Sequence, residues 1–180
     1  MIETARKLAA QPNTFWTNQL ENPDMAAGYE QLADEVWEQT NGRVDAFAQM
    51  VGTSHSLRGV GAALRRRNPN VKIVAVEPAE SAVLSGGNPG AHDIEGVGIG
   101  YTPPLWNATL VDRVIAVSTA DAKEMARRLA REEGLFAGTS SGANVCAAIE
   151  IGRILGPQAR VVTLMIDSGL KYLSTDVYRR

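Results

Sequence analysis

A loop of small and hydroxyl-bearing residues carries the strongest chemical signal in the sequence, Gly52-Thr53-Ser54-His55-Ser56. It follows an apolar run typical of a buried strand, residues 44–51, and precedes a helical run, residues 57–67. The first backbone N–H groups of a helix have no partner inside it, so such a joint can hold an anion such as phosphate. The same pattern fits an ordinary strand-to-helix turn in which Ser54 or Ser56 caps the helix.

Two further segments are rich in glycine. Gly138-Thr139-Ser140-Ser141-Gly142-Ala143 also opens a helix, and taken alone it is typical of a capping segment. Residues 95–103 place Gly96, Gly98 and Gly100 at alternate positions, but they neither follow a strand nor open a helix as a dinucleotide fingerprint requires. Glycine at this density instead indicates close approach of the backbone to a flat ligand.

The residues that bind metals or act as nucleophiles are few. Histidine occurs only at His55 and His92, and the single cysteine, Cys146, lies among small apolar residues on an expected helix. We therefore expect Cys146 to be a small buried side chain and find no metal-ligand spacing. A Ser-His-Asp triad using His55 and Asp167 lacks the strained nucleophile turn of such hydrolases. The sequence indicates neither a metal centre nor a serine hydrolase.

Helical and strand-like segments alternate along the chain. This alternation predicts an α/β fold of three layers, with a mostly parallel sheet flanked by helices. In such sheets ligands lie beyond the carboxyl ends of the strands, where the loops 52–56, 138–142 and 167–173 are expected to meet. The expected helices are 1–8, 26–39, 57–67, 122–133 and 142–155, the expected strands are 44–51, 71–77, 112–117 and 160–166, and residues 78–110 are expected to be irregular.

Composition narrows the class of protein. The chain has 180 residues, of which 44% are hydrophobic and 21% charged, with a formal net charge of -2. These values are typical of one globular domain and draw the chain to neither nucleic acid nor an anionic membrane. Arg65-Arg66-Arg67 is expected to be a solvated helix end. No run predicts a membrane span or a signal peptide, so we expect a cytoplasmic protein.

The ordered set of segments resembles the cysteine synthase (O-acetylserine sulfhydrylase) and cystathionine β-synthase family of pyridoxal-phosphate enzymes, which have the tryptophan-synthase-β fold. The resemblance covers nearly the whole chain, and the order of its segments makes it specific. The segments that carry it are 15–23 (FWTNQLENP), 44–47 (VDAF), 84–90 (LSGGNPG), 95–103 (EGVGIGYTP), 138–143 (GTSSGA) and 167–175 (DSGLKYLST), together with the loop 52–56.

The resemblance implies a role for each segment in holding pyridoxal phosphate. The loop 52–56 would hold the phosphate, and Ser140 would hydrogen-bond the pyridine nitrogen; a neutral hydroxyl there suits β-elimination and replacement. Gly98 and Tyr101 would help line the cofactor face, and Ser168 would lie at the ring-nitrogen end. The full set of expected cofactor-binding residues is Gly52, Thr53, Ser54, His55, Ser56, Gly96, Ser140 and Asp167.

The phosphate loop departs from the family pattern, Gly-Thr-Gly-Gly-Thr, at its two inner glycines, where this chain has Ser54 and His55. Side chains there restrict positive φ and could crowd the phosphate. His55 could instead donate a charge-assisted hydrogen bond to the phosphate, or point to the surface beside an adjusted loop. These three outcomes stay open at the level of sequence.

A second departure concerns the reaction. In the family a lysine forms a Schiff base with the cofactor, and a separate loop holds the substrate carboxylate; neither matches Lys7, Lys72, Lys123 or Lys171. The resemblance therefore implies that residues 1–180 are a single C-terminal, cofactor-phosphate-binding portion of a cysteine synthase-like enzyme, inactive alone. Alternatives are a non-catalytic binding or assembly subunit, or a relative with another substrate, such as cystathionine β-synthase or a Ser/Thr dehydratase.

The expected partners are a small amino-acid substrate and either a second copy of the chain or the missing N-terminal portion. Association is expected because an uncovered sheet would expose apolar surface around Trp16, Phe47 and Val162.

Overall fold

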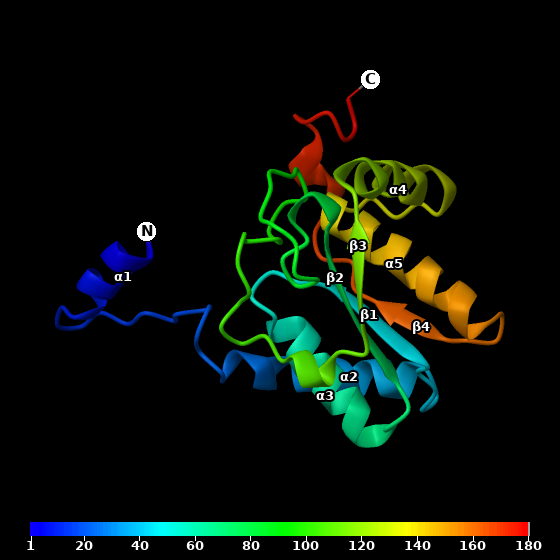
Figure 1. The fold of residues 1–180 in the computed structure, drawn as a ribbon, viewed down its shortest axis with the longest axis horizontal. Helices are drawn as coiled ribbons and strands as arrows, with labels where there is room; N and C mark the ends of the chain where they lie inside the picture. The colour runs from blue at the N-terminus through cyan, green and yellow to red at the C-terminus, as the bar shows by residue number, and fades with distance from the viewer. Residues whose placement is uncertain (180) are drawn as a thin grey trace.

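A computed structural model describes residues 1–179 as four strands and five α-helices, with three short 3₁₀ turns (Figure 1). The expected alternation of helices and strands is confirmed. In chain order the elements are α1 (Ile2–Ala9), α2 (Met25–Gln39), β1 (Ala46–Met50), α3 (His55–Arg67), β2 (Lys72–Pro78), η1 (Ala79–Ser81), η2 (Ala108–Leu110), β3 (Arg113–Val117), α4 (Thr119–Glu132), α5 (Thr139–Leu155), β4 (Val161–Thr163) and η3 (Gly169–Tyr172).

The four strands form one parallel sheet in the order β3-β2-β1-β4. From β1 the chain adds β2 and then β3 on one side, and β4 joins on the other side of β1. The order therefore reverses between β1 and β4, and ligands in open parallel sheets bind at such a switch point, beyond the carboxyl ends of the strands.

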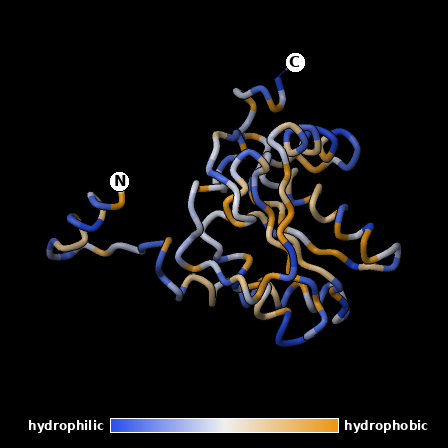
Figure 2. Tube along the Cα trace, in the orientation of Figure 1, coloured by the Kyte–Doolittle hydropathy of each residue, from blue (hydrophilic) through white to orange (hydrophobic). Residues whose placement is uncertain are grey.

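Helices cover both faces of the sheet, which gives the three layers that the alternation predicts (Figure 1). One apolar core joins α2 and α3 to the sheet through residues that include Phe47 and Leu64. The other joins α5 to the opposite face through residues that include Met50 and Ile151. The strands at the centre are correspondingly the most hydrophobic part of the trace (Figure 2).

Glycines let the helices cross closely within each layer. A Cβ placed on Gly59 of α3 would lie 2.4 Å from the carbonyl oxygen of Ala26 in α2. A Cβ on Gly142 of α5 would lie 2.1 Å from the carbonyl oxygen of Ala122 in α4. Real carbon and oxygen atoms do not approach this closely, so each crossing requires a residue without a side chain.

Element boundaries differ from the predictions at the sheet's carboxyl edge. The helix after β1 begins at His55 rather than at residue 57, and α5 begins at Thr139 rather than at residue 142. Both loops are therefore shorter, and their hydroxyl residues enter the first helical turns. Strand β4 ends at Thr163 rather than at residue 166, because the Asn144 side chain lies between β1 and the chain after β4 and replaces the next ladder bonds.

Three other expectations were wrong in part. Phe47 is fully buried in the α2–α3 core, so it forms no part of an exposed sheet face; Met165 and Ile166, which follow β4, are exposed apolar residues instead. Cys146 is half-buried. The arginines at 65–67 are not simply solvated, since each pairs with a carboxylate: Arg65 with Asp112, Arg66 with Glu30 and Arg67 with Asp34.

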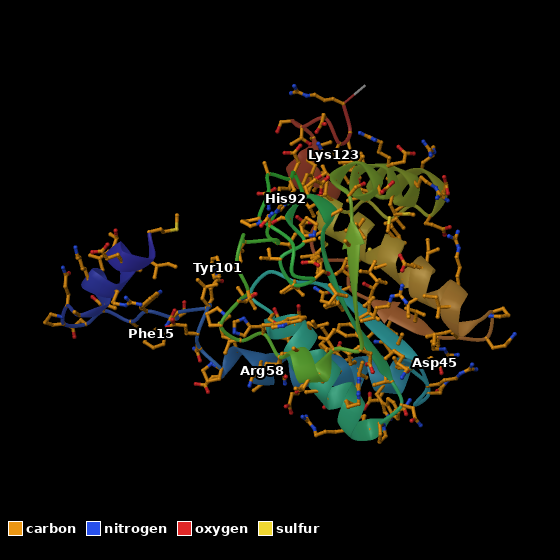
Figure 3. All side chains as sticks on the ribbon, in the orientation of Figure 1. Phe15, Asp45, Arg58, His92, Tyr101 and Lys123 are labelled. Carbon is orange, nitrogen blue, oxygen red and sulfur yellow. The ribbon has the colours of Figure 1, made fainter. Side chains whose placement is uncertain are left out.

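The first 24 residues contrast with this packed body. Helix α1 buries no residue, and Phe15 in the segment after it is 85% exposed (Figures 1 and 3). Across residues 1–179, no helix combines the length and apolar character needed to cross a membrane.

Candidate functional site

A cavity of about 530 Å³ lies at the switch point between the carboxyl ends of β1 and β4. Its wall combines four stretches of the chain: the segment before α2 with α2 itself, the end of β1 with the loop that follows, the glycine segment, and the residues after β4. The lining residues are Gln19, Tyr29, Leu32, Gln49, Met50, Gly52, Thr53, Ser54, Ser56, Gly96, Val97, Leu164, Met165 and Ile166. Most of the phosphate loop that the sequence predicts, together with Gly96, therefore faces one cavity.

The loop after β1 opens α3 without a side-chain cap. Ser54 has φ +76°, in the left-handed region, and its hydroxyl accepts no hydrogen bond from the helix. The backbone N–H groups of Ser56 and Leu57 find no acceptor among residues 1–179. Neither capping serine considered at the level of sequence is used as a cap. The first turn of α3 therefore presents free donors beside the cavity.

Gly52 sits against the glycine segment. A Cβ on Gly52 would lie 2.6 Å from the carbonyl oxygen of Gly96, and Gly96 itself has φ +80°. The segment is anchored behind this contact, where Gly98 donates its N–H to Val51 and the His92 ring donates to the Gly98 carbonyl at 3.0 Å. The two glycine-rich regions meet at backbone distance and leave the cavity floor without side chains at these points.

His55 follows none of the three outcomes considered for it. Its side chain is 2% exposed and is absent from the cavity lining, so it lies behind the loop rather than on the surface. Nδ1 lies 2.7 Å from the Thr53 hydroxyl, and Nε2 lies 3.0 Å from the Asn22 carbonyl oxygen. The left-handed backbone falls on Ser54 alone, and His55 takes an ordinary helical position.

The start of α5 supplies hydroxyls that are mostly committed to the fold. Thr139 accepts a 3.4 Å hydrogen bond from the Glu95 N–H, and Ser141 accepts a 2.9 Å bond from the Ile166 N–H. Ser140 between them is 1% exposed, and its hydroxyl makes no hydrogen bond to residues 1–179. Ser140 does not itself line the cavity, but its neighbours bond to the segments at 95–97 and 164–166 that do.

Asp167 lies beneath this helix start. Its Oδ2 accepts a 2.9 Å hydrogen bond from the Tyr172 hydroxyl, and its Oδ1 is buried without a partner in the described chain. Burial, and then the bond to this carboxylate, raises the pKa of Tyr172 to about 12. A Cβ on Gly138 would lie 2.1 Å from Asp167 Oδ1, so the carboxylate packs directly against the backbone that opens α5.

A buried amide pair was missed at the level of sequence. Asn144 accepts from the Met50 N–H at 2.7 Å and donates to Gln49 Oε1 at 3.1 Å and to the Leu164 carbonyl at 2.9 Å. Gln49 lines the cavity, and its Nε2 has no acceptor within residues 1–179. An amide inside an apolar strand run and another inside an apolar helix run were the available signal, because buried amides need partners.

The lysines lie elsewhere. Lys7 pairs with Glu3 on α1, Lys72 extends from the far edge of β2 near Asp112, and Lys171 pairs with Glu95 at 3.1 Å. Lys123 bonds Asp93 and Asp176 beside the C-terminal segment, near His92 (Figure 3). None of the lysines is among the residues that line the 530 Å³ cavity.

Known proteins match this arrangement closely. A family model described as "Pyridoxal-phosphate dependent enzyme" matches residues 1–167. A cysteine synthase of Staphylococcus aureus is 42% identical over 98% of this chain and 58% of its own length; cysteine synthase 3 of Caenorhabditis elegans is 40% identical over 93% and 50%. The chain thus spans little more than half the length of these relatives.

Solved structures agree with the sequence comparisons. O-acetylserine sulfhydrylase isoform 3 of Entamoeba histolytica superposes with a TM-score of 0.94 at 40% identity, covering 99% of this chain and 54% of that one. An O-acetylserine-dependent cystathionine β-synthase of Helicobacter pylori gives 0.93 at 32% identity, over 99% and 58%. The resemblance inferred from the sequence is confirmed.

Proposed function

Because the chain belongs to the family of pyridoxal-phosphate dependent enzymes, whose cofactor is pyridoxal phosphate, we propose that residues 1–180 form the cofactor-phosphate-binding portion of a cysteine synthase-like enzyme. Such an enzyme replaces the β-substituent of an O-activated serine by sulfide. The observation that carries the proposal is the uncapped start of α3, which faces the 530 Å³ cavity with free N–H groups.

The phosphate fits the loop after β1. An anion there would meet the N–H donors of Ser56 and Leu57 and the positive end of the helix dipole, with the hydroxyls of Thr53 and Ser56 in the same wall. A Cβ on Gly52 would lie 2.6 Å from the Gly96 carbonyl oxygen, so only glycine lets these two stretches of backbone meet in the cavity wall. The loop therefore offers donors and room, and among residues 1–179 no carboxylate lines the cavity to repel the anion.

The ring nitrogen fits Ser140. Its buried hydroxyl has no other partner, whereas the hydroxyls on both sides are committed to the fold. A hydroxyl that makes no hydrogen bond within residues 1–179 stays free to donate to a ligand atom or to accept from one. Pyridoxal phosphate, when bound, supplies an electron sink for β-elimination and replacement, and a neutral partner at its nitrogen keeps that sink moderate. In this proposal, Asp167 acts beneath Ser140, by packing against Gly138 and fixing the start of α5.

The reactive lysine would not come from this chain. Lys123 and Lys171 are tied to carboxylates, and Lys7 and Lys72 lie far from the switch point in the fold. The same observation favours a second candidate, a non-catalytic subunit that binds the cofactor or another chain. Exposed Met165 and Ile166 beside the open edge of β4 support association with a second copy or another chain. A cytoplasmic location remains part of this proposal, and the one cysteine, Cys146, is a free thiol, as is usual in a reducing compartment.

Binding and turnover experiments separate these candidates. The purified chain is titrated with pyridoxal phosphate and, as a control, with pyridoxal, which lacks the phosphate. We expect saturable binding of the phosphate form only, no lysine adduct after borohydride treatment beyond that seen with pyridoxal, and no cysteine formation from O-acetylserine and sulfide. Equal binding of pyridoxal and pyridoxal phosphate would show that the chain has no phosphate site. Turnover at ordinary enzyme rates would show that the chain supplies its own lysine.

A further inference from the structure

The buried ring of His55 has two hydrogen-bond partners. His55 is 2% exposed, and its hydrogen bonds join the Asn22 carbonyl oxygen to the Thr53 hydroxyl, which lies in the cavity wall. The ring therefore connects the segment before α2 with the loop after β1. No other hydrogen bond to the His55 ring is present among residues 1–179.

The chemistry of these partners fixes the protons of the neutral ring. A carbonyl oxygen only accepts, so Nε2 must carry the hydrogen that it donates to Asn22. In neutral imidazole the other nitrogen is then an acceptor, so the Thr53 hydroxyl donates its single hydrogen to Nδ1. In this state Thr53 offers only lone pairs to the cavity and repels an anionic oxygen.

A bound phosphate reverses this assignment. Phosphate oxygens of the dianion accept and do not donate, so Thr53 can bind one only by turning its hydrogen towards the cavity. The Thr53 oxygen is then an acceptor towards His55, and Nδ1 must donate. Since Nε2 still donates to Asn22, both nitrogens carry hydrogen and the ring is an imidazolium. The extra proton comes from solvent, and no other bond forms or breaks.

We propose that His55 is a positioning residue that couples phosphate binding at Thr53 to the uptake of one proton. The proposal rests on the phosphate site proposed above and adds how that site is regulated: the loop would hold a phosphate dianion and a proton together. The positive ring would lie behind the hydroxyl that touches the phosphate, and would strengthen that hydrogen bond without entering the cavity.

The titratable and charged groups on the elements around the ring do not bond to it, so the proton is assigned to His55. The segment that supplies Asn22 carries Glu21 and Asp24, α2 carries Tyr29, and α3 carries Arg58. Glu21 accepts from Asn18, Tyr29 lines the cavity, and none of these groups is hydrogen-bonded to the ring. The only other histidine, His92, accepts from the Ile94 N–H at 3.2 Å and donates to Gly98, so its bonds need only the neutral ring.

The test uses methyl phosphate, a phosphate monoester without ring or aldehyde, and the whole chain. Above pH 7 such esters are mainly dianions. Because the chain has two histidines, ¹⁵N spectra resolve each ring. At pH 7.5 we expect saturating methyl phosphate to convert His55 to the doubly protonated form and to leave His92 unchanged. Because binding takes up one proton, the affinity should fall as the pH rises above 7, by at most about tenfold for each pH unit.

Three variants separate coupling from a structural effect. His55→Gln keeps a polar group without a titrating proton, and its methyl phosphate affinity should become independent of pH above 7. Thr53→Val should bind more weakly with no change at His55, whereas Thr53→Ser, which keeps the hydroxyl, should restore both affinity and the spectral change. Circular dichroism checks that each variant folds.

Each outcome decides the proposal. Methyl phosphate bound with a neutral His55, or bound with the same pH dependence in His55→Gln, would overturn it, as would no binding at all. Coupled binding of methyl phosphate without any binding of pyridoxal phosphate would sustain the proton linkage and overturn the cofactor assignment instead.

Discussion

The helices α3 and α5 both begin at the carboxyl edge of the sheet, and neither has a side-chain cap, yet the hydroxyls of their first turns are used differently. At α3 no side chain caps the helix, and the donors of Ser56 and Leu57 are left free. At α5 the hydroxyls of Thr139 and Ser141 each accept from a distant loop, which fastens the residues around Glu95 and Ile166 to the helix. The hydroxyls that open α3 face the cavity, whereas two of the hydroxyls that open α5 hold the walls of the site.

This difference shows how two segments of similar sequence can have different roles in the site. Both helix starts are rich in glycine and hydroxyls, and both follow the same rule of packing, with a glycine one turn inside the helix where the neighbouring helix crosses. What separates them is the number of hydroxyls already bonded to protein. Among the hydroxyls that open α5, only that of Ser140 makes no hydrogen bond within residues 1–179, whereas at α3 the hydroxyls of both Ser54 and Ser56 are unbonded and belong to residues that line the cavity.

We expect the largest effect from substitutions at the glycines where the helices cross, which is the feature that the two regions share. Gly142→Ala places a Cβ 2.1 Å from the Ala122 carbonyl oxygen and 2.9 Å from the Ala126 N, both backbone atoms that cannot turn aside. We expect a loss of about 3 kcal/mol or more in the free energy of unfolding, measured by urea denaturation. Gly59→Ala should cost a similar amount.

Gly28→Ala is the matched control for both substitutions. Gly28 lies in α2, with no atom within 4 Å of a built Cβ, so alanine should be neutral or stabilise by up to about 1 kcal/mol. If Gly142→Ala were as stable as Gly28→Ala, the close crossing of α4 and α5 would not exist in solution.

Adjacent serines sharpen the comparison within one helix turn. Ser141→Ala leaves the Ile166 N–H without its 2.9 Å acceptor, and we expect a loss of about 2 kcal/mol in the free energy of unfolding. Ser140→Ala breaks no bond within the described chain and should change stability by less than about 0.5 kcal/mol. For bound pyridoxal phosphate the order should reverse in the absorption spectrum, where Ser140→Ala shifts the band and Ser141→Ala does not. If Ser140→Ala left the spectrum unchanged, Ser140 would not be the partner of the ring nitrogen.

The sequence predicted the architecture well because periodicity is local. The alternating runs defined the helices and strands, although α4 begins at Thr119, directly after its cap Ser118, and not at residue 122 as expected. Helix starts were harder to predict at His55 and Thr139. There the turn residues themselves enter the helix, since a left-handed Ser54 and close packing at Gly138 let the helix begin earlier.

The candidate site was predictable only as a set of loops. The order of segments indicated that residues 52–56, 96 and 140 belong together, but it could not show that His55 turns behind the loop. That orientation depends on the Asn22 carbonyl, 33 residues away in the chain. The Gln49–Asn144 pair depends likewise on a partner 95 residues distant. Long-range polar contacts of this kind leave no periodic trace in the sequence.

The carboxylate beneath α5 supplies the next prediction. Tyr172→Phe removes the 2.9 Å hydrogen bond to Asp167 and leaves that partly buried carboxylate without its main donor. We expect a loss of about 1 kcal/mol in the free energy of unfolding. Folding raises the pKa of Tyr172 to about 12. The difference in free energy of unfolding between the native chain and Tyr172→Phe should therefore have its full value below about pH 10 and decline as the pH rises towards 12.

Tyr101→Phe provides the control, because Tyr101 is 45% exposed and its hydroxyl bonds to nothing within residues 1–179 (Figure 3). Equal stability of the two phenylalanine variants between pH 7 and 9 would mean that the Tyr172 hydroxyl does not support the start of α5.

The smallest effect concerns the ion pairs that hold the C-terminal segment against α4. Lys123 bonds Asp176 and Asp93 at 2.9 Å each, which raises the pKa of the lysine and lowers that of Asp176. Because both carboxylates are largely exposed, Lys123→Met should lower the melting temperature by only about 2 °C.

The pH dependence of that shift identifies its cause. The lowered pKa of Asp176 contributes stability above its ordinary value of 3.8 that is lost as the pH falls through the folded pKa. The raised pKa of Lys123 contributes stability below its ordinary value of 10.5 that is lost as the pH rises through the folded pKa. The difference between the native chain and Lys123→Met should therefore be constant between about pH 5 and 10 and shrink outside that window. A difference that persists at pH 2 would mean that the lysine acts through the packing of its aliphatic chain rather than through its charge.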